Sequence, residues 1–445
     1  MRLPSLLLAA ACLTACGAAS SDDTPVAPAP RTRTYAYPGG IKATLGTSPT
    51  ADFLAANVTA AGDRQRLADD GLRFVRLDML WQDIETAPGV WNWTHFDAVV
   101  DDLLARHMTP IFTVVYANPA YDDAGLPCPH PDGYAYVCLG SDFGPYFRFA
   151  ATAAARYRGK VKLYEIWNEP NGWFRFWPRV VGGDPAAYAQ LMAGAADAIH
   201  AACGDCQVLS GGMVFLNSPI EWGQVEFMQR MRAAVPDVFQ KADGIGFHAY
   251  TFYPPVDPPE SKTLNQTPFD EALAAVRAAC VCDKPLWVTE TGWTSVGSLT
   301  EERRAQFGIR GWLLSLSQGV KASLWWSVRD YHAAHVVAPQ ETHFGLLDRD
   351  GHPHPVYEAL VSAEKLVGDA VEVTDVRGEY GFAAPYTWAL RLGWPGGKTG
   401  DVLWYAGLGE GPLVPATLHG KAAVRLRDGA AVTPDRLDGE PVLFR

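Results

Sequence analysis

The sequence predicts an α/β fold: a (β/α)₈ barrel (TIM barrel) with a small C-terminal β-sandwich domain. Three observations lead to this prediction. The length of 445 residues suits a large barrel plus an accessory domain. From about residue 35 to residue 365, short apolar runs alternate with amphipathic helical segments. After residue 366 the pattern changes to short strands separated by turns such as Asp428-Gly429.

The predicted barrel strands are apolar runs rich in β-branched and aromatic residues. We expect them over 41–47, 74–78, 110–116, 161–167, 208–214, 244–250, 286–290 and 322–326. We expect helices between them, for example over 96–106, 146–157, 185–201, 226–234 and 301–317. A doubly wound open sheet is the alternative. It is less favoured because no phosphate-binding glycine pattern follows the strands at 161–167 and 286–290.

The sequence pattern of the C-terminal region predicts strands and no helix. The expected strands cover 371–373, 387–392, 402–406, 422–426 and 441–444. No long linker precedes them, so the two domains are expected to share an interface. The predicted division of the chain is a leader at 1–15, a flexible tether at 16–34, the barrel at 35–365 and the β-sandwich at 366–445.

The first fifteen residues are predicted to be a leader for export. Arg2 supplies a positive start, an apolar stretch follows over 6–11, and Leu13-Thr14-Ala15 forms a small-residue cleavage site. Cys16 follows directly, which resembles the bacterial lipobox and implies lipid attachment to its sulfur. An ordinary secretory signal that happens to contain Cys16 is the alternative. We therefore expect an exported protein that is lipid-anchored to the cell envelope, at the outer membrane or cell surface.

The remaining cysteines agree with export. Besides Cys12 and Cys16, the chain has three close pairs: Cys128 and Cys138, Cys203 and Cys206, and Cys280 and Cys282. Close pairs favour local disulfides in an oxidising compartment, and Cys128–Cys138 is the pairing we most expect. A zinc site built from the second and third pairs is the alternative.

Bulk charge and composition narrow the class of partner. The formal net charge of −12 argues against nucleic acid, because binding phosphates requires a basic face. It also makes an acidic polysaccharide a less favoured substrate. Fifteen tryptophans and 11% aromatic residues are compatible with stacking on sugar rings, but tryptophans also fill cores.

Two of the predicted strands end in a glutamate. Leu163-Tyr164-Glu165-Ile166-Trp167-Asn168-Glu169-Pro170 and Leu286-Trp287-Val288-Thr289-Glu290-Thr291-Gly292 are both apolar runs that become polar at their carboxyl ends. In a barrel the carboxyl ends of all strands face one cleft, so Glu169 and Glu290 are expected to meet despite their separation along the chain. Two such carboxyl groups are the minimum needed to cleave a glycosidic bond.

These strand ends resemble those of the retaining glycoside hydrolases of clan A, which contains families 5 and 39. The likeness covers nearly the whole barrel and leans toward family 39 because of the C-terminal β-domain. It rests on several motifs taken together: Gly71-Leu72-Arg73-Phe74-Val75-Arg76 with Trp81, Trp167-Asn168-Glu169-Pro170, Phe247-His248-Ala249-Tyr250, Val288-Thr289-Glu290-Thr291-Gly292-Trp293, Trp325-Trp326 and Gly345-Leu346-Leu347-Asp348.

The resemblance implies roles for the catalytic pair and its neighbours. Glu290 matches the nucleophile and Glu169 the acid/base. A charged Glu290 nearby would raise the pKa of Glu169 into its working range. Arg76 and Tyr250 would hold Glu290 ionised and oriented. A structural ion pair is the alternative for Arg76.

Other positions are expected to contact the sugar. Asn168 matches the residue that bonds the sugar 2-hydroxyl, and His248 would contact the sugar or the nucleophile. Trp326 would form the floor under the ring. Trp173, with Phe174, Phe176 and Trp177, would line a subsite or form a collapsed aromatic loop. For His248 the alternative is a core histidine, and either Trp325 or Trp326 could merely pack the barrel.

We expect neither a metal nor another cofactor. His332, His335, His343, His352 and His354 lie near one another in sequence, but their spacing is loose and no acidic partner is well spaced. The chemistry of the clan does not require a metal ion.

The prediction is a retaining hydrolase of β-glycosidic bonds in a polysaccharide or oligosaccharide, working by double displacement as a monomer. Aromatic-rich loops favour endo cleavage. One alternative is a transglycosidase that remodels the cell's own exopolysaccharide. Another is a surface glycan-binding protein without turnover, although the full set of supporting residues counts against it. The sequence does not identify the sugar.

Overall fold

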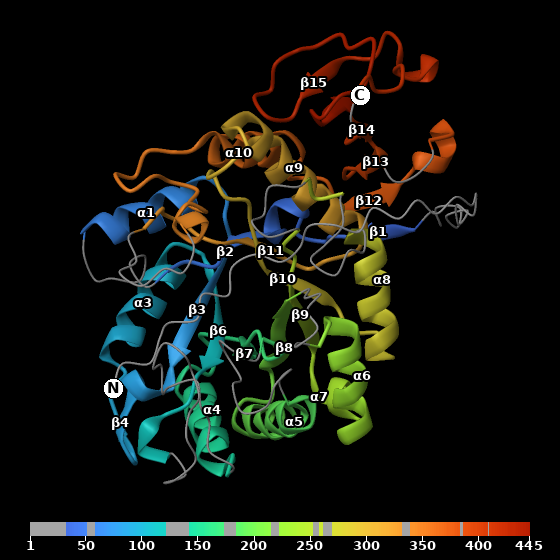
Figure 1. Cartoon of the computed structure of the whole chain (residues 1–445). Helices are drawn as coiled ribbons and strands as arrows, with labels where there is room; N and C mark the ends of the chain where they lie inside the picture. The colour runs from blue at the N-terminus through green and yellow to red at the C-terminus, as the bar shows by residue number, and fades with distance from the viewer. Residues whose placement is uncertain are drawn as a thin grey trace, which may run out of the picture.

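The structure is a computed structural model that describes residues 33–50, 58–121, 142–172, 184–214, 222–251, 258–260, 269–331, 339–382, 386–407 and 409–445. A closed barrel of eight parallel strands lies inside a ring of helices, and an antiparallel sheet lies beside it (Figure 1). The predicted barrel with a C-terminal β-domain is therefore confirmed. The predicted leader, the tether up to residue 32, Cys16, the Cys128–Cys138 disulfide and Trp173 lie outside the described residues. The end of the predicted tether is not flexible, because Thr34 is the first residue of strand β1 and pairs with Thr374.

The barrel closes in the order expected for consecutive βα units. Each strand pairs with its neighbours in sequence order, and β2 pairs with β11 to complete the ring. Its strands are β2 (Leu45–Thr47), β3 (Phe74–Leu80), β6 (Thr109–Val115), β7 (Leu163–Asn168), β8 (Gln207–Val214), β9 (Gly244–His248), β10 (Leu286–Thr291) and β11 (Ser323–Trp325). A small hairpin, β4 (Glu85–Ala87) with β5 (Val90–Trp91), follows β3.

The first barrel strand is shorter than predicted. Residues Ile41–Thr44 form the 3₁₀ turn η1, and the strand begins only at Leu45. The Ile41 amide donates to the Ala370 carbonyl and the Lys42 amide to the Gly368 carbonyl. These two amides bind the segment after the last barrel helix instead of a neighbouring strand, so the apolar pattern at 41–44 reflects burial without strand pairing.

Helices follow the strands and cover the outside of the barrel. Two predicted starts are confirmed: the Asp184 side chain accepts a hydrogen bond from the Ala187 amide, and the Thr300 side chain accepts one from Arg303. The α-helices are α1 (Val58–Asp69), α2 (Trp81–Ile84), α3 (Thr94–Ala105), α4 (Gly144–Arg156), α5 (Pro185–Ala202), α6 (Gln224–Ala234), α7 (Val238–Lys241), α8 (Phe269–Cys280), α9 (Glu301–Ser317) and α10 (Pro355–Val367). No described helix combines the length and the apolar character needed to cross a bilayer.

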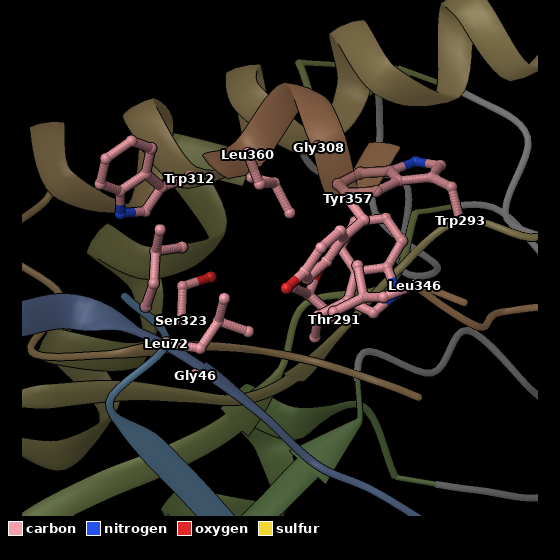
Figure 2. Close-up of a pocket in the computed structure, with 12 residues that line it drawn as sticks. Gly46, Leu72, Thr291, Trp293, Gly308, Trp312, Ser323, Leu346, Tyr357 and Leu360 are labelled. Atoms are coloured by element: carbon pink, nitrogen blue, oxygen red, sulfur yellow. The ribbon is translucent and has the colours of Figure 1, made fainter. Parts of the chain in front are cut away.

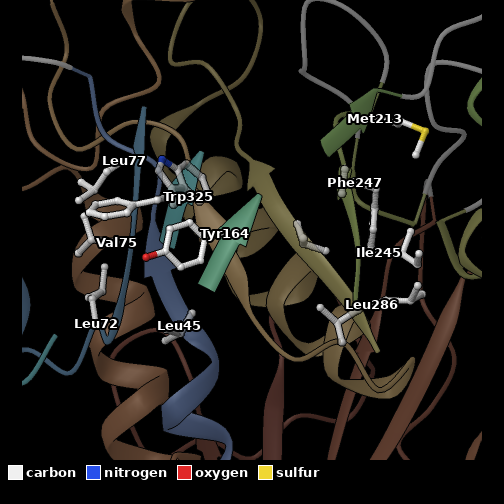
Figure 3. Close-up of a cluster of buried hydrophobic side chains, with 14 of the residues drawn as sticks. Leu45, Leu72, Val75, Leu77, Tyr164, Met213, Ile245, Phe247, Leu286 and Trp325 are labelled. Carbon is white, nitrogen blue, oxygen red and sulfur yellow. The ribbon is translucent and has the colours of Figure 1, made fainter. Parts of the chain in front are cut away.

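The barrel separates two apolar layers. The larger lies between strands and helices, where side chains such as Val75, Leu77 and Phe247 are fully buried (Figure 3). The smaller fills the bottom of the barrel interior and comes from residues near the beginnings of their strands: Ile111, Leu163, Leu209, Trp287, Ala322 and Leu324. Because this cluster fills the barrel interior at the amino-terminal ends of the strands, a ligand can enter only at their carboxyl ends, as in other packed barrels.

The C-terminal domain differs from the expected sandwich. Its described strands form one six-stranded antiparallel sheet, in the order β1-β12-β13-β14-β16-β15. The bounds are β1 (Thr34–Ala36), β12 (Glu372–Asp375), β13 (Thr387–Gly393), β14 (Thr399–Tyr405), β15 (Ala423–Arg425) and β16 (Val442–Phe444). Strand β1 comes from the N-terminal side of the barrel. A short polar strand whose partner lies more than 300 residues away carries little sequence signal.

Two of the expected local disulfides are present. Cys203 pairs with Cys206, whose Cα atoms are 5.4 Å apart, and Cys280 pairs with Cys282 at 5.1 Å. Both loops lie at helix ends, after α5 and α8. Because each pair closes on itself, these four sulfurs are not available as the thiolates that the zinc alternative required.

Candidate active site

The carboxyl ends of β7, β9 and β10 bring three ionisable side chains together. Oxygen atoms of Glu169 and Glu290 and a ring nitrogen of His248 lie within 4.8 Å of one another. The side chains of Glu169 and Glu290 keep 17% and 13% of their surface exposed, whereas His248 is fully buried. The two carboxyl groups thus lie close together and remain accessible from the open end of the barrel.

The backbone is irregular where it presents these side chains. Strand alternation from the inward-facing Glu165 would direct Asn168 out of the barrel. Trp167 and Glu169 instead adopt φ values of 71° and 44°, in the left-handed region that non-glycine residues rarely occupy. In β10 the pairing register with β9 shifts between Val288 and Glu290. Both irregularities turn carboxylates into the barrel mouth, and strained backbone of this kind is typical of functional sites.

Glu290 accepts a short hydrogen bond on each carboxylate oxygen, and the Ser48 hydroxyl lies 3.5 Å from Oε1. Arg76 Nη1 donates to Oε1 at 2.7 Å, and the Tyr250 hydroxyl donates to Oε2 at 3.0 Å. Burial raises the pKa of Glu290, and the nearby Glu169 adds to the rise, while His248 and Arg76 oppose it. Burial also raises the pKa of Tyr250 well above its usual value, so Tyr250 remains a protonated donor. Glu290 is therefore a fixed carboxylate with one face toward the mouth.

His248 lies between the two carboxyl groups. Its Nδ1 is 2.7 Å from Glu169 Oε1 and 3.6 Å from Glu290 Oε2. Burial lowers its pKa, but the charge of Glu290 and the hydrogen bond with Glu169 outweigh that effect and raise the pKa above the usual value. Its imidazole is enclosed, and its described contacts are with carboxylates. The expected contact with a sugar stays a prediction.

Gly212 makes room for this imidazole. A Cβ atom on Gly212 would lie 2.1 Å from His248 Nε2 and 2.7 Å from Thr289 Oγ1, closer than atoms can approach. Any side chain at Gly212 would therefore displace His248 from Glu169. The sequence contains Gly211-Gly212 inside the strand predicted over 208–214, and a glycine within a strand is a signal of close approach that the sequence analysis did not use.

Asn168 is fixed by Arg76 and lies beside the acid/base candidate. Arg76 Nη2 donates to Asn168 Oδ1 at 2.8 Å, and the Asn168 side chain also hydrogen-bonds Tyr116. Since Oδ1 accepts from the guanidinium, the Nδ2 group is the end left to donate. This arrangement suits donation to a hydroxyl oxygen of a bound ligand.

Glu165 is a site residue that the sequence analysis missed. It is fully buried inside the barrel, where Arg76 Nε donates to its Oε2 at 2.5 Å and Thr113 Oγ1 lies at 3.3 Å. Arg76 thus links a buried carboxylate, Glu165, to an accessible one, Glu290. An acidic residue in the middle of an otherwise apolar strand was the available signal, because such a residue requires a cationic partner.

Two adjacent tryptophans, Trp325 at the end of β11 and Trp326 directly after it, have different surroundings. Trp325 is 4% exposed, and its Nε1 donates to the Phe344 carbonyl at 2.7 Å. It lines an apolar cavity of about 20 Å³ between the barrel wall and helices α9 and α10 (Figure 2), so it packs the fold. Trp326 is partly exposed and contacts the rings of Tyr331 and Phe344. Of the two, Trp326 is the one available to a ligand.

A cation could in principle bind the Glu169, His248 and Glu290 atoms, which have the spacing of metal ligands. Arg76 and Tyr250 already occupy both Glu290 oxygens, however, and a guanidinium at 2.7 Å would repel a metal ion. Among the predicted late histidines, His352 Nδ1 contacts Asp348 at 3.0 Å in an exposed turn and His354 Nε2 contacts Asp330 at 2.9 Å. Asp348, Asp350 and His352 also have the spacing of metal ligands, so the absence of a metal stays a prediction.

Comparisons with known proteins identify the fold. No family model and no curated protein match the sequence. Among solved structures, a family 39 glycoside hydrolase from Bacteroides cellulosilyticus WH2 aligns over 91% of this chain and 81% of its own, at 18% identity and TM-score 0.66. A monomeric β-xylosidase from Caulobacter crescentus CB15 covers 88% and 80%, at 18% identity and TM-score 0.57.

A third similar structure is xylanase 10B from Thermotoga petrophila RKU-1 in complex with xylobiose. It covers 72% of this chain and 93% of its own, at 14% identity and TM-score 0.51. The first two likenesses extend over most of both chains. At these identities the likeness establishes the fold, and the activity must be argued from the site.

Proposed function

We propose that this protein is a retaining glycoside hydrolase that cleaves β-glycosidic bonds in a polysaccharide or oligosaccharide. The observation that carries the proposal is the separation of Glu169 and Glu290, whose oxygen atoms lie within 4.8 Å. Carboxyl groups about 5 Å apart suit double displacement, whereas inversion requires about 6.5–9.5 Å to admit a water molecule between carboxyl and sugar. The three similar structures named above, a family 39 glycoside hydrolase, a β-xylosidase and a xylanase, add support.

In the first step Glu290 attacks the anomeric carbon, and Glu169 gives its proton to the departing glycosidic oxygen. The carbon–oxygen bond breaks, and a glycosyl ester forms on Glu290. Arg76 and Tyr250 hold the attacking carboxylate in place, since each donates to one of its oxygens. Ordering the nucleophile in this way lowers the barrier because little rearrangement remains to be made.

In the second step Glu169, now ionised, accepts a proton from water, and the water oxygen attacks the same carbon. The ester bond to Glu290 breaks, and the sugar leaves with its original anomeric configuration. His248 contacts both carboxyl groups and carries a raised pKa, so it stabilises whichever of them is ionised. Asn168 is placed to donate to the sugar as charge develops on the ring.

The test is the configuration of the first product. The soluble protein lacking residues 1–32 would be given a β-linked oligosaccharide from a panel of glucans, mannans, xylans and bacterial exopolysaccharides. Proton NMR should show the β-anomer first, with none formed by Glu169→Gln or Glu290→Gln. An α-anomer formed first would reject retention. Binding without turnover, unchanged in both variants, would indicate a glycan-binding protein.

Endo action and the cellular location are finer parts of the proposal. The aromatic residues Trp173, Phe174, Phe176 and Trp177, which follow the acid/base candidate in sequence, favour an open cleft with several subsites. Release of only terminal monosaccharides would contradict endo action. Export and a lipid on Cys16 rest on the leader sequence. Labelling of cells with a fatty-acid analogue should mark the wild type but not Cys16→Ser.

A further inference from the structure

Asp78 is a third accessible carboxylate in the barrel mouth, and the double displacement does not use it. It lies two residues after Arg76 on β3, so both side chains point to the same face of the strand. Its side chain is 49% exposed, whereas that of Arg76 is 2% exposed. Asp78 Oδ1 is 3.7 Å from Arg76 Nη1, the same atom that donates to Glu290. One guanidinium therefore separates Asp78 from the proposed nucleophile.

Neutralising Arg76 does not require Asp78. The guanidinium already makes direct hydrogen bonds to two carboxylates, Glu165 and Glu290. The 3.7 Å separation from Asp78 is too long for a hydrogen bond. A structural role in charge balance would place Asp78 in contact with the cation and out of solvent, as Glu165 is.

The Asp78 carboxylate keeps acceptor capacity directed into the mouth. Thr113 of the neighbouring strand β6 is the register partner of Asp78, and its hydroxyl donates to Glu165 Oε2 at 3.3 Å. A carboxylate has about four lone-pair sites, and half of this side chain remains accessible. Hydroxyl groups of a sugar are donors of the kind such an acceptor binds.

The charge of the mouth also restricts what can bind there. Four carboxyl groups, those of Asp78, Glu165, Glu169 and Glu290, surround one guanidinium and one imidazole. Carboxyl groups in the mouth therefore outnumber the guanidinium and the imidazole by four to two. A uronate or sulfated sugar placed against Asp78 would bring a further acidic group against this set, which is unfavourable.

We propose that Asp78 accepts hydrogen bonds from hydroxyl groups of the sugar bound between Glu169 and Glu290, and that it thereby selects neutral sugars and rejects uronates. The inference rests on the proposed function and names the substrate class of the same site. Asp78 is then a specificity-determining residue, while Glu169 and Glu290 perform the chemistry.

The test uses 2,4-dinitrophenyl β-glycosides of glucose, xylose, mannose and glucuronic acid, followed by mono-deoxy analogues of the neutral glycoside that the wild type hydrolyses fastest. Asp78→Asn should lower kcat/KM on that glycoside by about 10- to 100-fold, the loss expected for a hydrogen bond to a charged group. On the analogue that lacks the contacted hydroxyl, the same substitution should cost less than about 3-fold. The preference for the neutral glycoside over the glucuronide should shrink by at least about 10-fold.

Asp101→Asn is the matched control, because Asp101 is an exposed carboxylate on the outer helix α3 that pairs with Lys160. Asp101→Asn also removes one carboxylate charge. It should leave unchanged the ratio of kcat/KM between the parent glycoside and its deoxy analogue, and the ratio between the neutral glycoside and the glucuronide. An equal loss by Asp78→Asn on the parent and on every deoxy analogue would overturn the contact. A wild type that prefers the glucuronide would overturn the selectivity and leave the proposed function standing. A wild type that hydrolyses none of the probes would count against both.

Discussion

Two buried arginine–carboxylate clusters in this molecule have similar chemistry and different surroundings. In the barrel mouth, Arg76 contacts Glu165 and Glu290. At the junction between the barrel and the C-terminal sheet, Arg310 of α9 makes two hydrogen bonds to Glu260, and Trp404 of β14 donates to Glu260 Oε1 at 2.7 Å. We call these the mouth cluster and the junction cluster.

The junction cluster is closed. The side chains of Arg310 and Glu260 are 3% and 1% exposed, and both carboxylate oxygens accept hydrogen bonds. The mouth cluster is open, because Glu290 keeps 13% exposure and a second carboxyl group, Glu169, faces it. Trp167 and Glu169 at the mouth cluster have left-handed backbone, whereas the other described non-glycine residues with positive φ, His107 and Val281, belong to neither cluster. Buried charge alone therefore does not mark a functional site, whereas buried charge that holds an accessible carboxylate does.

The comparison is tested most strongly by Glu290→Gln. We expect the rate on a β-linked substrate to fall by at least about 10⁴-fold, because an amide cannot form the glycosyl ester. Stability should be maintained or increased, since burial raises the pKa of Glu290 and the folded protein therefore disfavours its charge. Initial rates measure the catalytic effect, and thermal melting measures the effect on stability. A large loss of both rate and stability would mean that Glu290 has a structural role.

The junction cluster should show the opposite behaviour. Glu260→Ala leaves Arg310 buried without a counter-charge, so we expect a loss of about 3–5 kcal/mol in the free energy of unfolding. Activity per folded molecule at low temperature should stay within about 2-fold, because the cluster lies outside the barrel mouth. Denaturant titration and initial rates check this.

The double variant Glu260→Leu with Arg310→Met is the control, because it removes both charges and should lose less stability than the single variant. A double variant as unstable as Glu260→Ala would show that packing, and not the unpaired charge, sets the cost.

Glu165→Gln should have an intermediate effect. Glu165 orients Arg76, so its loss should lower kcat by about 10- to 100-fold with little change in KM. Removing a nearby negative charge also makes Glu290 easier to ionise, so the acidic limb of the pH–rate profile should move to lower pH. A loss of rate without movement of that limb would mean that Glu165 supports the fold alone.

The smallest effect concerns the protonation of His248. Its pKa is raised by Glu290 and Glu169, so protonated His248 contributes stability below its unfolded pKa of about 6.5, and this contribution is lost as pH rises through the folded pKa. In Glu290→Gln the pKa of His248 should fall, because the charge of Glu290 that raises it is removed. Imidazole NMR titration measures it, and an unchanged pKa would remove Glu290 as the cause.

The sequence predicted the barrel because each strand has a strong local pattern, and it identified Glu169 and Glu290 because polar residues interrupt two of those patterns. The sequence did not show which way the side chains at the end of β7 point. Regular alternation along β7 would direct Asn168 out of the barrel, but the left-handed backbone of Trp167 turns it inward. Glu165 was read as part of an apolar run, since its partner Arg76 is distant in sequence.

The C-terminal sheet was predicted less completely for a related reason. Strand β1 is only three residues long, and its pairing with β12 depends on the barrel bringing the two segments together. The richness in tryptophan was also ambiguous. Large side chains such as Trp81, Trp293 and Trp404 are buried, so much of that composition packs the core instead of a substrate.

The most direct test of the central claim is capture of the covalent intermediate. The soluble protein would be incubated with 2,4-dinitrophenyl 2-deoxy-2-fluoro-β-glycosides, in which the fluorine slows the second step. We predict a mass increase of one fluoroglycosyl group and, after proteolysis, its location on Glu290, with no labelling of Glu290→Gln. Labelling of another residue would contradict the assignment of the nucleophile. Rapid turnover of ordinary β-glycosides with no covalent adduct and an inverted product would contradict double displacement itself.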